Sequence, residues 1–284
     1  MLRITSELRI ALAGLIALSL LGACGTLTVP QERQLGEEFS REIRREVILL
    51  RDSVVTGYVE RIGQEIVQAA GPQPFPYHFY VVEDDEINAF AAPAGHIYIH
   101  TETILMARNV SELAGVIAHE VGHVVKRHIA ENYGRQRNTG IAHQGFVLAA
   151  GVLGGSPAAG AANLGGALAG TAYLNKFGRD AERESDAFAV EVMPKAGYDP
   201  IGLVTFFKTL RSESGSGGAS FLSSHPATDE RIEETRLMIE ALPSRSDLRV
   251  DDSGRFEIIQ RRVQLLTGEA TPHGESRSPR RPAD

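Results

Sequence analysis

Residues 114–125 read AGVIAHEVGHVV and place two histidines, His119 and His123, four positions apart. A helix turns by about 100° per residue, so the two imidazoles would lie about 40° apart and share one face. The other side of this segment is apolar, and its residues are Leu113, Ile117, Val121, Val124, Val125 and Ile129. The pattern predicts a helix from about Asn109 to Asn132 whose apolar side packs on the core.

The polar face of this helix suits a metal ion. Two imidazoles one helical turn apart can bind one Zn²⁺ at about 2.0–2.1 Å each, and Glu120, which follows His119, can reach a water molecule there as a general base. Gly115 and Gly122 flank the histidines. Because glycine costs about 1 kcal/mol in a helix, they predict that another segment approaches closely. His128 falls on the apolar side, and we interpret it as a structural residue.

A buried helix with two hydrogen-bonded histidines is the alternative, and a third protein ligand would distinguish the two interpretations. Residues 180–193, DAERESDAFAVEVM, supply a candidate. On a helical wheel Glu182 and Asp186 lie on the apolar side, whereas Glu184 and Glu191 lie opposite. Carboxylates directed at a core are costly unless a cation meets them. We therefore expect Glu182 to be the third ligand and Asp186 to accept a hydrogen bond from a ligand histidine. A salt-bridged acidic turn is the other reading.

The composition limits the class of protein. The 284 residues are enough for one sizeable domain or two small ones. Hydrophobic residues make up 43% and charged residues 23%, which is ordinary for a globular protein. The formal net charge of −7 argues against a nucleic-acid binder, whose binding surface would be basic. The single cysteine excludes an intrachain disulfide.

The N-terminus has the layout of a bacterial lipoprotein signal. A positively charged start precedes an apolar run at 10–21 that is too short to span a bilayer. LGAC at 21–24 resembles a lipobox, which predicts removal of residues 1–23 and acylation of Cys24; an ordinary signal peptide is the alternative. We therefore expect a periplasmic protein anchored to the membrane through Cys24. By resemblance to enterobacterial sorting rules, Gly25 favours the outer over the inner membrane.

The remaining segments predict a mainly helical α+β fold with a small sheet beside the histidine helix. The predicted helices are 31–70, 179–193 and 228–242, and the predicted strands are 77–82, 88–92 and 96–100. Residues 138–175 carry no formal charge, and we interpret them as two closely packed helices rather than a membrane hairpin. Residues 214–218 have the composition of a flexible loop, and the tail after Gly268 has that of disorder.

Several ordered motifs resemble one peptidase family. HEVGH at 119–123 and ERESD at 182–186 are similar to the HExxH…ExxxD pattern of peptidase family M48, the gluzincin group of HtpX-like and CaaX-protease-like enzymes. The other matching segments are YVERIG (58–63), INAFAAPAGHIYIH (87–100), AGYDP (196–200) and SSHPATDERI (223–232). The resemblance covers roughly residues 30–242 and is closest to the periplasmic BepA- and LoiP-like branch. One segment, Thr101-Glu102-Thr103, departs from the family pattern, which usually has Gly-Leu after a threonine.

The resemblance implies a zincin-type metallopeptidase domain at 24–245 and a C-terminal extension at 246–284. It implies an endopeptidase with one Zn²⁺ on the three predicted ligands and Glu120 as general base. Its substrates would be unfolded or misassembled envelope proteins, which is a role in protein quality control. A function of another class stays open, namely a lipoprotein chaperone or assembly factor with a latent or structural zinc site. An intact Glu120 argues against it, because a structural site needs no base.

Two further assignments rest on the same resemblance. The segment Asn88-Ala89-Phe90 would form an edge strand that binds substrate by strand addition. His225, restricted toward an extended backbone by Pro226, would lie near the metal. It would either occupy the open metal position until substrate displaces it or stabilise the oxyanion. Arg231, in the same motif, would help to anchor this segment.

Overall fold

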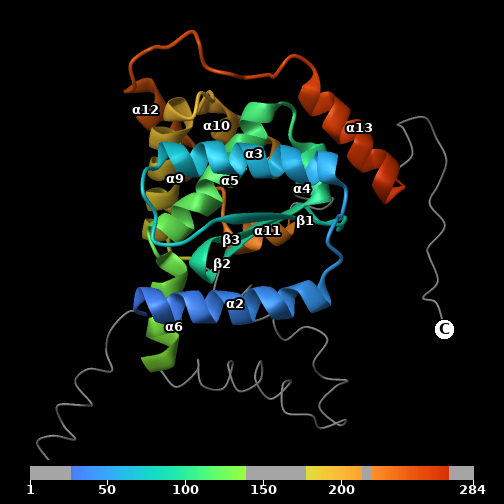
Figure 1. Ribbon diagram of the computed structural model, residues 1–284. Helices are drawn as coiled ribbons and strands as arrows, with labels where there is room; N and C mark the ends of the chain where they lie inside the picture. The colour runs from blue at the N-terminus through green and yellow to red at the C-terminus, as the bar shows by residue number, and fades with distance from the viewer. Residues whose placement is uncertain (1–26, 139–176, 213–218, 269–284) are drawn as a thin grey trace, which may run out of the picture.

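A computed structural model describes residues 27–138, 177–212 and 219–268 of the chain (Figure 1). Cys24 and the signal sequence, the uncharged stretch beyond residue 138, the glycine-rich segment at 214–218 and the tail after Gly268 lie outside these residues. Among the residues that are described, no helix has both the length and the apolar character needed to cross a membrane. Helices dominate the architecture and a small sheet accompanies them, which confirms the predicted α+β class.

The N-terminal helical region consists of two helices, α2 (Val29–Glu46) and α3 (Ser53–Ala69). Each begins at a side-chain cap. Thr28 and Gln31 form a capping box at α2, and Asp52 accepts hydrogen bonds from the first amides of α3. The chain between the helices runs along the sheet, where the Leu50 amide donates to the Val81 carbonyl over 2.9 Å. This pairing divides the helical stretch that was predicted at 31–70.

Three short strands form the sheet in the order β1-β3-β2: β1 (His78–Val82), β2 (Ala89–Ala92) and β3 (His96–His100). β1 is parallel to β3, and β2 is antiparallel to it. The connection from β2 to β3 is a tight turn, η1 (Pro93–Gly95), with both Ala94 and Gly95 at positive φ. All three predicted strands are confirmed, and the order places β2 at an edge.

The segment that departs from the family pattern forms a short helix after β3, α4 (Thr101–Met106). Its two threonines hold the β1–β2 connection in place. The Thr101 hydroxyl donates to the Asp84 carbonyl over 2.8 Å, and the Thr103 hydroxyl donates to the Asn88 carbonyl over 2.7 Å.

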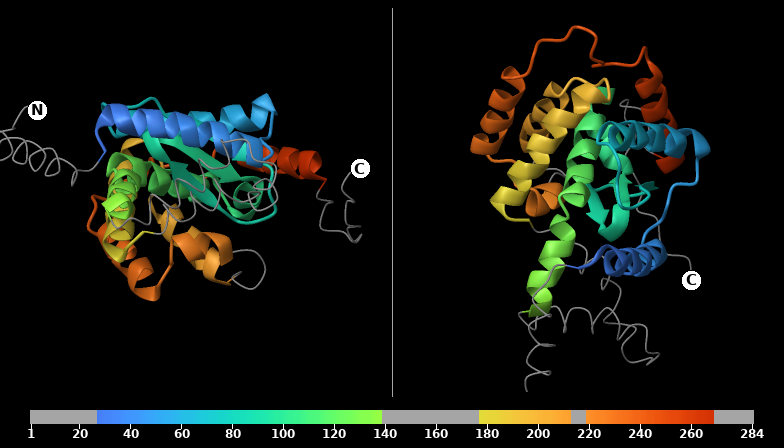
Figure 2. Two further views of the ribbon diagram at one scale, coloured as in Figure 1. Left: turned by 90° about the horizontal axis from the view of Figure 1, so that it is seen from below. Right: turned by 60° about the vertical axis from the view of Figure 1, so that its left-hand side comes forward.

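The histidine helix, α5 (Val110–Val125), lies at the centre of the molecule. Asn109 caps it through the Glu112 amide over 3.0 Å. Figure 2 shows it between α9 (Arg179–Lys195) and the sheet, and α3 and α10 (Ile201–Ser212) also contact it. It ends earlier than the predicted Asn132, because Arg127 adopts a positive φ of 60° and a new helix, α6 (His128–Asn138), begins.

The glycines of α5 lie at close contacts with two neighbouring helices, as the sequence predicted. A Cβ atom at Gly115 would lie 2.9 Å from the backbone of Leu203 in α10. A Cβ atom at Gly122 would lie 3.1 Å from the Ser185 Cα atom in α9. Glycine therefore allows α9 and α10 to reach the face of α5 that carries the histidines.

The C-terminal part contains α11 (Ala219–Ser224), α12 (Asp229–Glu240) and α13 (Arg255–Thr267). The last predicted helix, 228–242, corresponds to α12, and α13 is a further helix that was not predicted. α13 packs against α3 and α4, and its side chains Phe256, Ile259 and Val263 belong to the main core. The packed core therefore continues past residue 245.

Candidate metal centre

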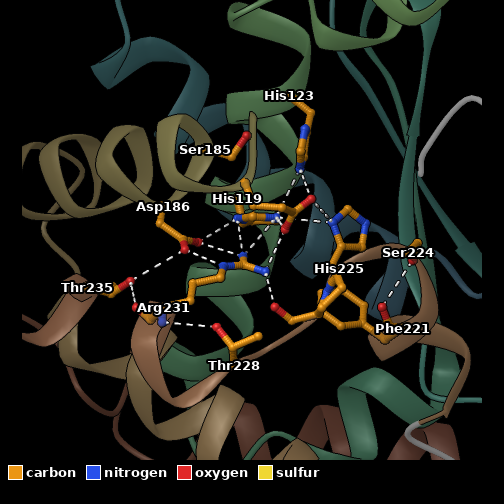
Figure 3. A network of polar contacts seen from close by, with 12 residues as sticks. His119, His123, Ser185, Asp186, Phe221, Ser224, His225, Thr228, Arg231 and Thr235 are labelled. Atoms are coloured by element: carbon orange, nitrogen blue, oxygen red, sulfur yellow. Dashed lines mark hydrogen bonds and ion pairs between the residues drawn. The ribbon is translucent and has the colours of Figure 1, made fainter. Parts of the chain in front are cut away.

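Four buried side chains from three parts of the chain converge beside α5. His119 and His123 come from α5, Glu182 comes from α9, and His225 follows α11. Each offers a ligand atom, and these four atoms all lie within 4.8 Å of one another. Figure 3 shows the three imidazole rings directed toward one point. The structure thus brings together the three ligands predicted from the sequence and the histidine expected near them.

The nitrogen atoms at this point are arranged to bind a cation. His123 Nε2 lies 3.0 Å from His119 Nε2, and His119 Nε2 lies 3.3 Å from His225 Nδ1. The opposite Nδ1 atoms of His119 and His123 contact other side chains, and protons on these Nδ1 atoms would leave both Nε2 atoms available as metal ligands. Glu182 Oε1 completes the set at 3.1 Å from His225 Nδ1 and 3.5 Å from His123 Nε2. Two or three imidazoles and one carboxylate are a suitable donor set for a divalent transition metal.

Asp186 contacts His119 on the side away from the convergence point, and Arg231 lies beside both Asp186 and His119 (Figure 3). His119 Nδ1 lies 2.9 Å from Asp186 Oδ1, the contact predicted from the helical wheel. The Arg231 guanidinium contacts Asp186 at 2.5 and 2.8 Å and Glu182 Oε2 at 2.5 Å. Arg231 also donates to the Pro226 carbonyl over 3.2 Å. It therefore connects the residue after His225 with the two buried carboxylates of α9.

These contacts decide the charge states of the two buried acids. Burial alone raises the pKa of Glu182, but His225, His119 and Arg231 together lower it well below its usual range. Burial likewise raises the pKa of Asp186, and Arg231 and His119 lower it by more than this. Both carboxylates are therefore ionised at neutral pH, as metal and histidine partners require.

Glu120 lies beside the four converging groups without joining them. Its side chain is fully buried, and within the described chain neither carboxylate oxygen accepts a hydrogen bond of normal geometry. The nearest titratable partner is His225, whose Nε2 atom is 3.5 Å from Glu120 Oε1. Burial raises the pKa of Glu120 to about 7, although His225 and the nearby Ala91 amide act in the opposite direction.

His128 contacts the site in a way that the helical wheel did not predict. Its Nδ1 atom lies 3.0 Å from His123 Nδ1, and its Nε2 atom lies 3.2 Å from Glu184 Oε2. A continuous helix would have placed His128 on the apolar side of α5. Phe177 was also missed, although its ring stacks on His123 at 3.8 Å between centroids. No sequence pattern indicated either contact.

The predicted substrate segment lies at the edge of the sheet that faces α5. The His100 amide donates to the Asn88 carbonyl over 3.0 Å, so Asn88 and Phe90 direct their backbone groups toward β3. The alternate residues, Ala89 and Ala91, direct theirs away from β3. β2 contacts α5, the helix that carries Glu120.

Comparisons with known proteins agree with this geometry. The model of Peptidase family M48 matches residues 53–239. The Beta-barrel assembly-enhancing protease of Escherichia coli (strain K12) is 33% identical over 218 residues, which are 75% of this chain and 45% of that protein. The corresponding protein of Yersinia pestis is 34% identical over 221 residues, with the same shares of each chain. Metalloprotease LoiP of Escherichia coli (strain K12) is 29% identical over 164 residues, 58% of this chain and 62% of LoiP.

The chain spans less than half the length of the Beta-barrel assembly-enhancing proteases that it matches. The matched region contains α3, the sheet, α5, α9 and α12, and therefore all of the elements that bring the candidate metal ligands together. The family match covers more than half of the chain, and these relatives are of the branch that the motifs predicted. The chain therefore belongs to peptidase family M48.

Proposed function

We propose that this protein is a zinc-dependent endopeptidase in which His119, His123 and Glu182 hold the metal. The convergence of these three side chains beside the buried Glu120, whose carboxylate oxygens accept no hydrogen bond of normal geometry from the described residues, carries the proposal. Burying a carboxylate that accepts no hydrogen bond costs free energy. A structural metal site does not require such a group beside the metal, whereas a catalytic site requires a general base. The membership in peptidase family M48 supports the same reaction class.

Zn²⁺ in such a site supplies a Lewis acid and lowers the pKa of water that it binds. Glu120 accepts the proton as the water oxygen attacks a peptide carbonyl carbon. It then delivers that proton to the amide nitrogen as the carbon–nitrogen bond breaks. Asp186 holds the tautomer of His119 through the 2.9 Å contact, and Arg231 keeps Asp186 ionised and oriented.

The outer edge of β2 is the proposed substrate site. Ala89 directs its backbone amide and carbonyl away from β3, so an extended peptide can pair with the strand at this position. Asn88 and Phe90 direct their backbone groups toward β3 and so hold this segment in the sheet. The Phe90 ring also stacks on Tyr98 at 4.9 Å between centroids. Main-chain pairing reads little sequence. We therefore assign unfolded or misassembled envelope proteins as substrates, in protein quality control.

The location that we propose is the periplasm, with the protein anchored to the membrane through a lipid on Cys24. The outer membrane is favoured over the inner membrane. The support is the lipobox-like LGAC at 21–24, and the relatives include the Beta-barrel assembly-enhancing protease. Labelled palmitate should be incorporated into the wild-type protein but not into Cys24→Ser. Cleavage elsewhere without incorporation would leave an ordinary signal peptide.

His225 is the proposed switch at this site. Its Nδ1 atom is close enough to His119 and Glu182 to occupy a metal position, while its Nε2 atom faces Glu120. Bound in this way it would exclude water, and substrate entry would displace it so that it can stabilise the oxyanion. His225→Ala should retain zinc and change peptidase activity at least about tenfold, some 1.4 kcal/mol of barrier. Unchanged kinetics and unchanged inhibitor affinity would remove His225 from this role.

Casein degradation tests the proposed activity as a whole. Wild-type protein should degrade casein, a chelator should stop the reaction, and added zinc should restore it. Glu120→Gln, nearly the same size but unable to accept the proton, should bind zinc and remain folded without activity. A chaperone or assembly factor predicts instead that zinc-loaded wild type prevents aggregation but cleaves nothing, and that Glu120→Gln behaves like wild type.

A further inference from the structure

The break after α5 places a further histidine, His128, in contact with His123. His123 and His128 are five residues apart, so a continuous helix would turn their side chains about 140° away from each other. In the structure Arg127 has a φ of 60° and α6 starts at His128. The two Nδ1 atoms consequently approach to 3.0 Å, and both side chains are buried.

Contacts from a distant helix maintain this break. A positive φ is unfavourable for any residue with a side chain other than glycine, and it persists only where the surroundings impose it. Arg127 donates to Glu32 Oε2 of α2 over 2.9 Å from Nε and 2.7 Å from Nη2, and it also donates to the Leu27 carbonyl. Glu32 is only 1% exposed, so this ion pair is a buried contact between α2 and the end of α5.

The contacts of these two histidines are compatible with one arrangement of protons when a metal is bound. With His123 Nε2 directed at the metal position, His123 Nδ1 carries the proton and donates it to His128 Nδ1. His128 must then carry its own proton on Nε2, where Glu184 Oε2 lies 3.2 Å away as acceptor. His119 differs, because its Nδ1 contacts the Asp186 carboxylate directly.

We propose that His128 is a positioning residue for the metal site, which holds the tautomer and ring orientation of His123, with Glu184 as the outer acceptor. This inference rests on the proposed zinc site. Histidine ligands usually donate their second nitrogen to a carboxylate, a carbonyl or water, and loss of that partner weakens metal binding. Here a neutral imidazole takes the place of that acceptor for one ligand, and the exposed carboxylate of Glu184 accepts the next hydrogen bond.

Zinc affinity of two His128 variants tests this role, with competition against a chromophoric chelator as the readout. His128→Leu keeps the apolar volume but removes the acceptor, and we expect zinc affinity to fall by about ten- to a hundred-fold. His128→Asn places its Oδ1 atom where Nδ1 was, because both are bonded to Cγ, and it should recover most of that affinity. If His128 served only for packing, leucine would bind zinc as tightly as wild type and asparagine would offer no advantage.

Glu184→Gln and Glu191→Gln provide a matched pair on α9. Both residues are exposed, but only Glu184 contacts His128, whereas Glu191 pairs with Lys195. Glu184→Gln should weaken zinc binding by a few-fold, and Glu191→Gln should leave it unchanged. Equal affinities in these two variants would remove Glu184 from the arrangement.

Side-chain nitrogen NMR of the zinc-loaded wild type covers the case in which the leucine variant does not fold. The expected spectrum has the His128 proton on Nε2 and a hydrogen-bonded proton on His123 Nδ1. A His128 proton on Nδ1 overturns the inference. A wild-type chain that binds no zinc would overturn the proposed function, and this inference with it. A wild type that binds zinc, together with a leucine variant of equal affinity, overturns this inference alone.

Discussion

Glu182 and Glu184 illustrate how two residues of one type acquire opposite surroundings on the same helix. Two positions along a helix correspond to a rotation of about 200°. The Glu182 side chain is accordingly 4% exposed and lies among His119, His123 and His225, while the Glu184 side chain is 58% exposed. Their identity as carboxylates is the same, so their difference in function comes from the face alone.

Metal analysis of two alanine variants tests this assignment. Glu182→Ala removes the only carboxylate among the four converging groups and should lose bound zinc. Glu184→Ala leaves those groups intact and should still contain about one zinc per chain at saturating metal. A Glu184 variant without zinc, beside a Glu182 variant that retains it, would reverse the assignment of the α9 faces.

At the scale of elements, some helix positions require glycine for close packing with a neighbouring helix and others do not. Gly57 lies on α3 with no atom within 4 Å of an added Cβ, whereas a Cβ at Gly115 would meet the Leu203 backbone at 2.9 Å. Contacts of this length with backbone atoms force a helix to move. Glycine at position 115 therefore permits the close approach of α5 and α10.

Alanine at these two positions should change stability in opposite directions. Gly57→Ala should raise the free energy of unfolding by about 0.5–1 kcal/mol, because alanine favours the helix. Gly115→Ala should lower it by about 1–3 kcal/mol through overpacking, despite the same helical preference. Urea denaturation of the metal-free proteins measures both values. A Gly115 variant as stable as wild type would show that α10 can move without cost.

The cap of α3 also predicts a pH-dependent stability. Asp52 Oδ1 accepts hydrogen bonds from the Val54 and Val55 amides, and Arg262 of α13 contacts both carboxylate oxygens at 2.8 and 2.7 Å. Arg262 first, and then these amides, lower the pKa of Asp52 to about 2. A carboxylate with a lowered folded-state pKa stabilises the fold above its unfolded pKa, and this contribution is lost as pH falls toward the folded value.

Comparison of wild type with Asp52→Ala isolates this contribution. At pH 6 the variant should be less stable by about 1 kcal/mol, the usual value of a helix cap. The difference should shrink as the pH falls from about 4 toward 2, because the wild-type carboxylate then becomes protonated. Urea unfolding in the presence of chelator, at several pH values, gives the two curves. A difference that stays constant down to pH 2 would contradict this account of Asp52.

At the scale of the whole molecule, the site and the core depend on segments that are far apart in the sequence. His119 and His225 are separated by 106 positions, and α13 returns to α3 and α4 across the molecule (Figure 1). Phe256, Ile259 and Val263 of α13 belong to the same core as α5. Gln260 adds a hydrogen bond of 2.7 Å to the Ala107 carbonyl.

Truncation at two positions tests whether α13 is part of the folding unit. A chain that ends at residue 245 loses three buried apolar side chains and should be destabilised by on the order of 5 kcal/mol. This value is comparable with the whole stability of many domains, so poor solubility is expected. A chain that ends at residue 268 keeps α13 and should melt like the full-length protein. Equal melting temperatures of the two truncated chains would place α13 outside the folding unit.

Local periodicity was sufficient to predict the three strands and the inward faces of the two helices that carry the predicted metal ligands. The spacing of His119 and His123, and that of Glu182 and Asp186, defines which side chains share a face, because helix geometry is the same in every sequence context. The strands of the sheet followed from β-rich runs between proline and glycine. These features depend only on residues within one or two helical turns, or within one strand.

Only the tertiary structure decided where α5 ends and what contacts its histidines. The break at Arg127 depends on Glu32, which is 95 positions away in the sequence, and it brings His128 onto His123. The division of the N-terminal helical region likewise depends on pairing with β1, and α13 depends on the core that it completes. A periodic pattern identifies a face but not its partner. Such contacts form only when distant segments pack together, and their combined free energy then overrides the local preference of the chain.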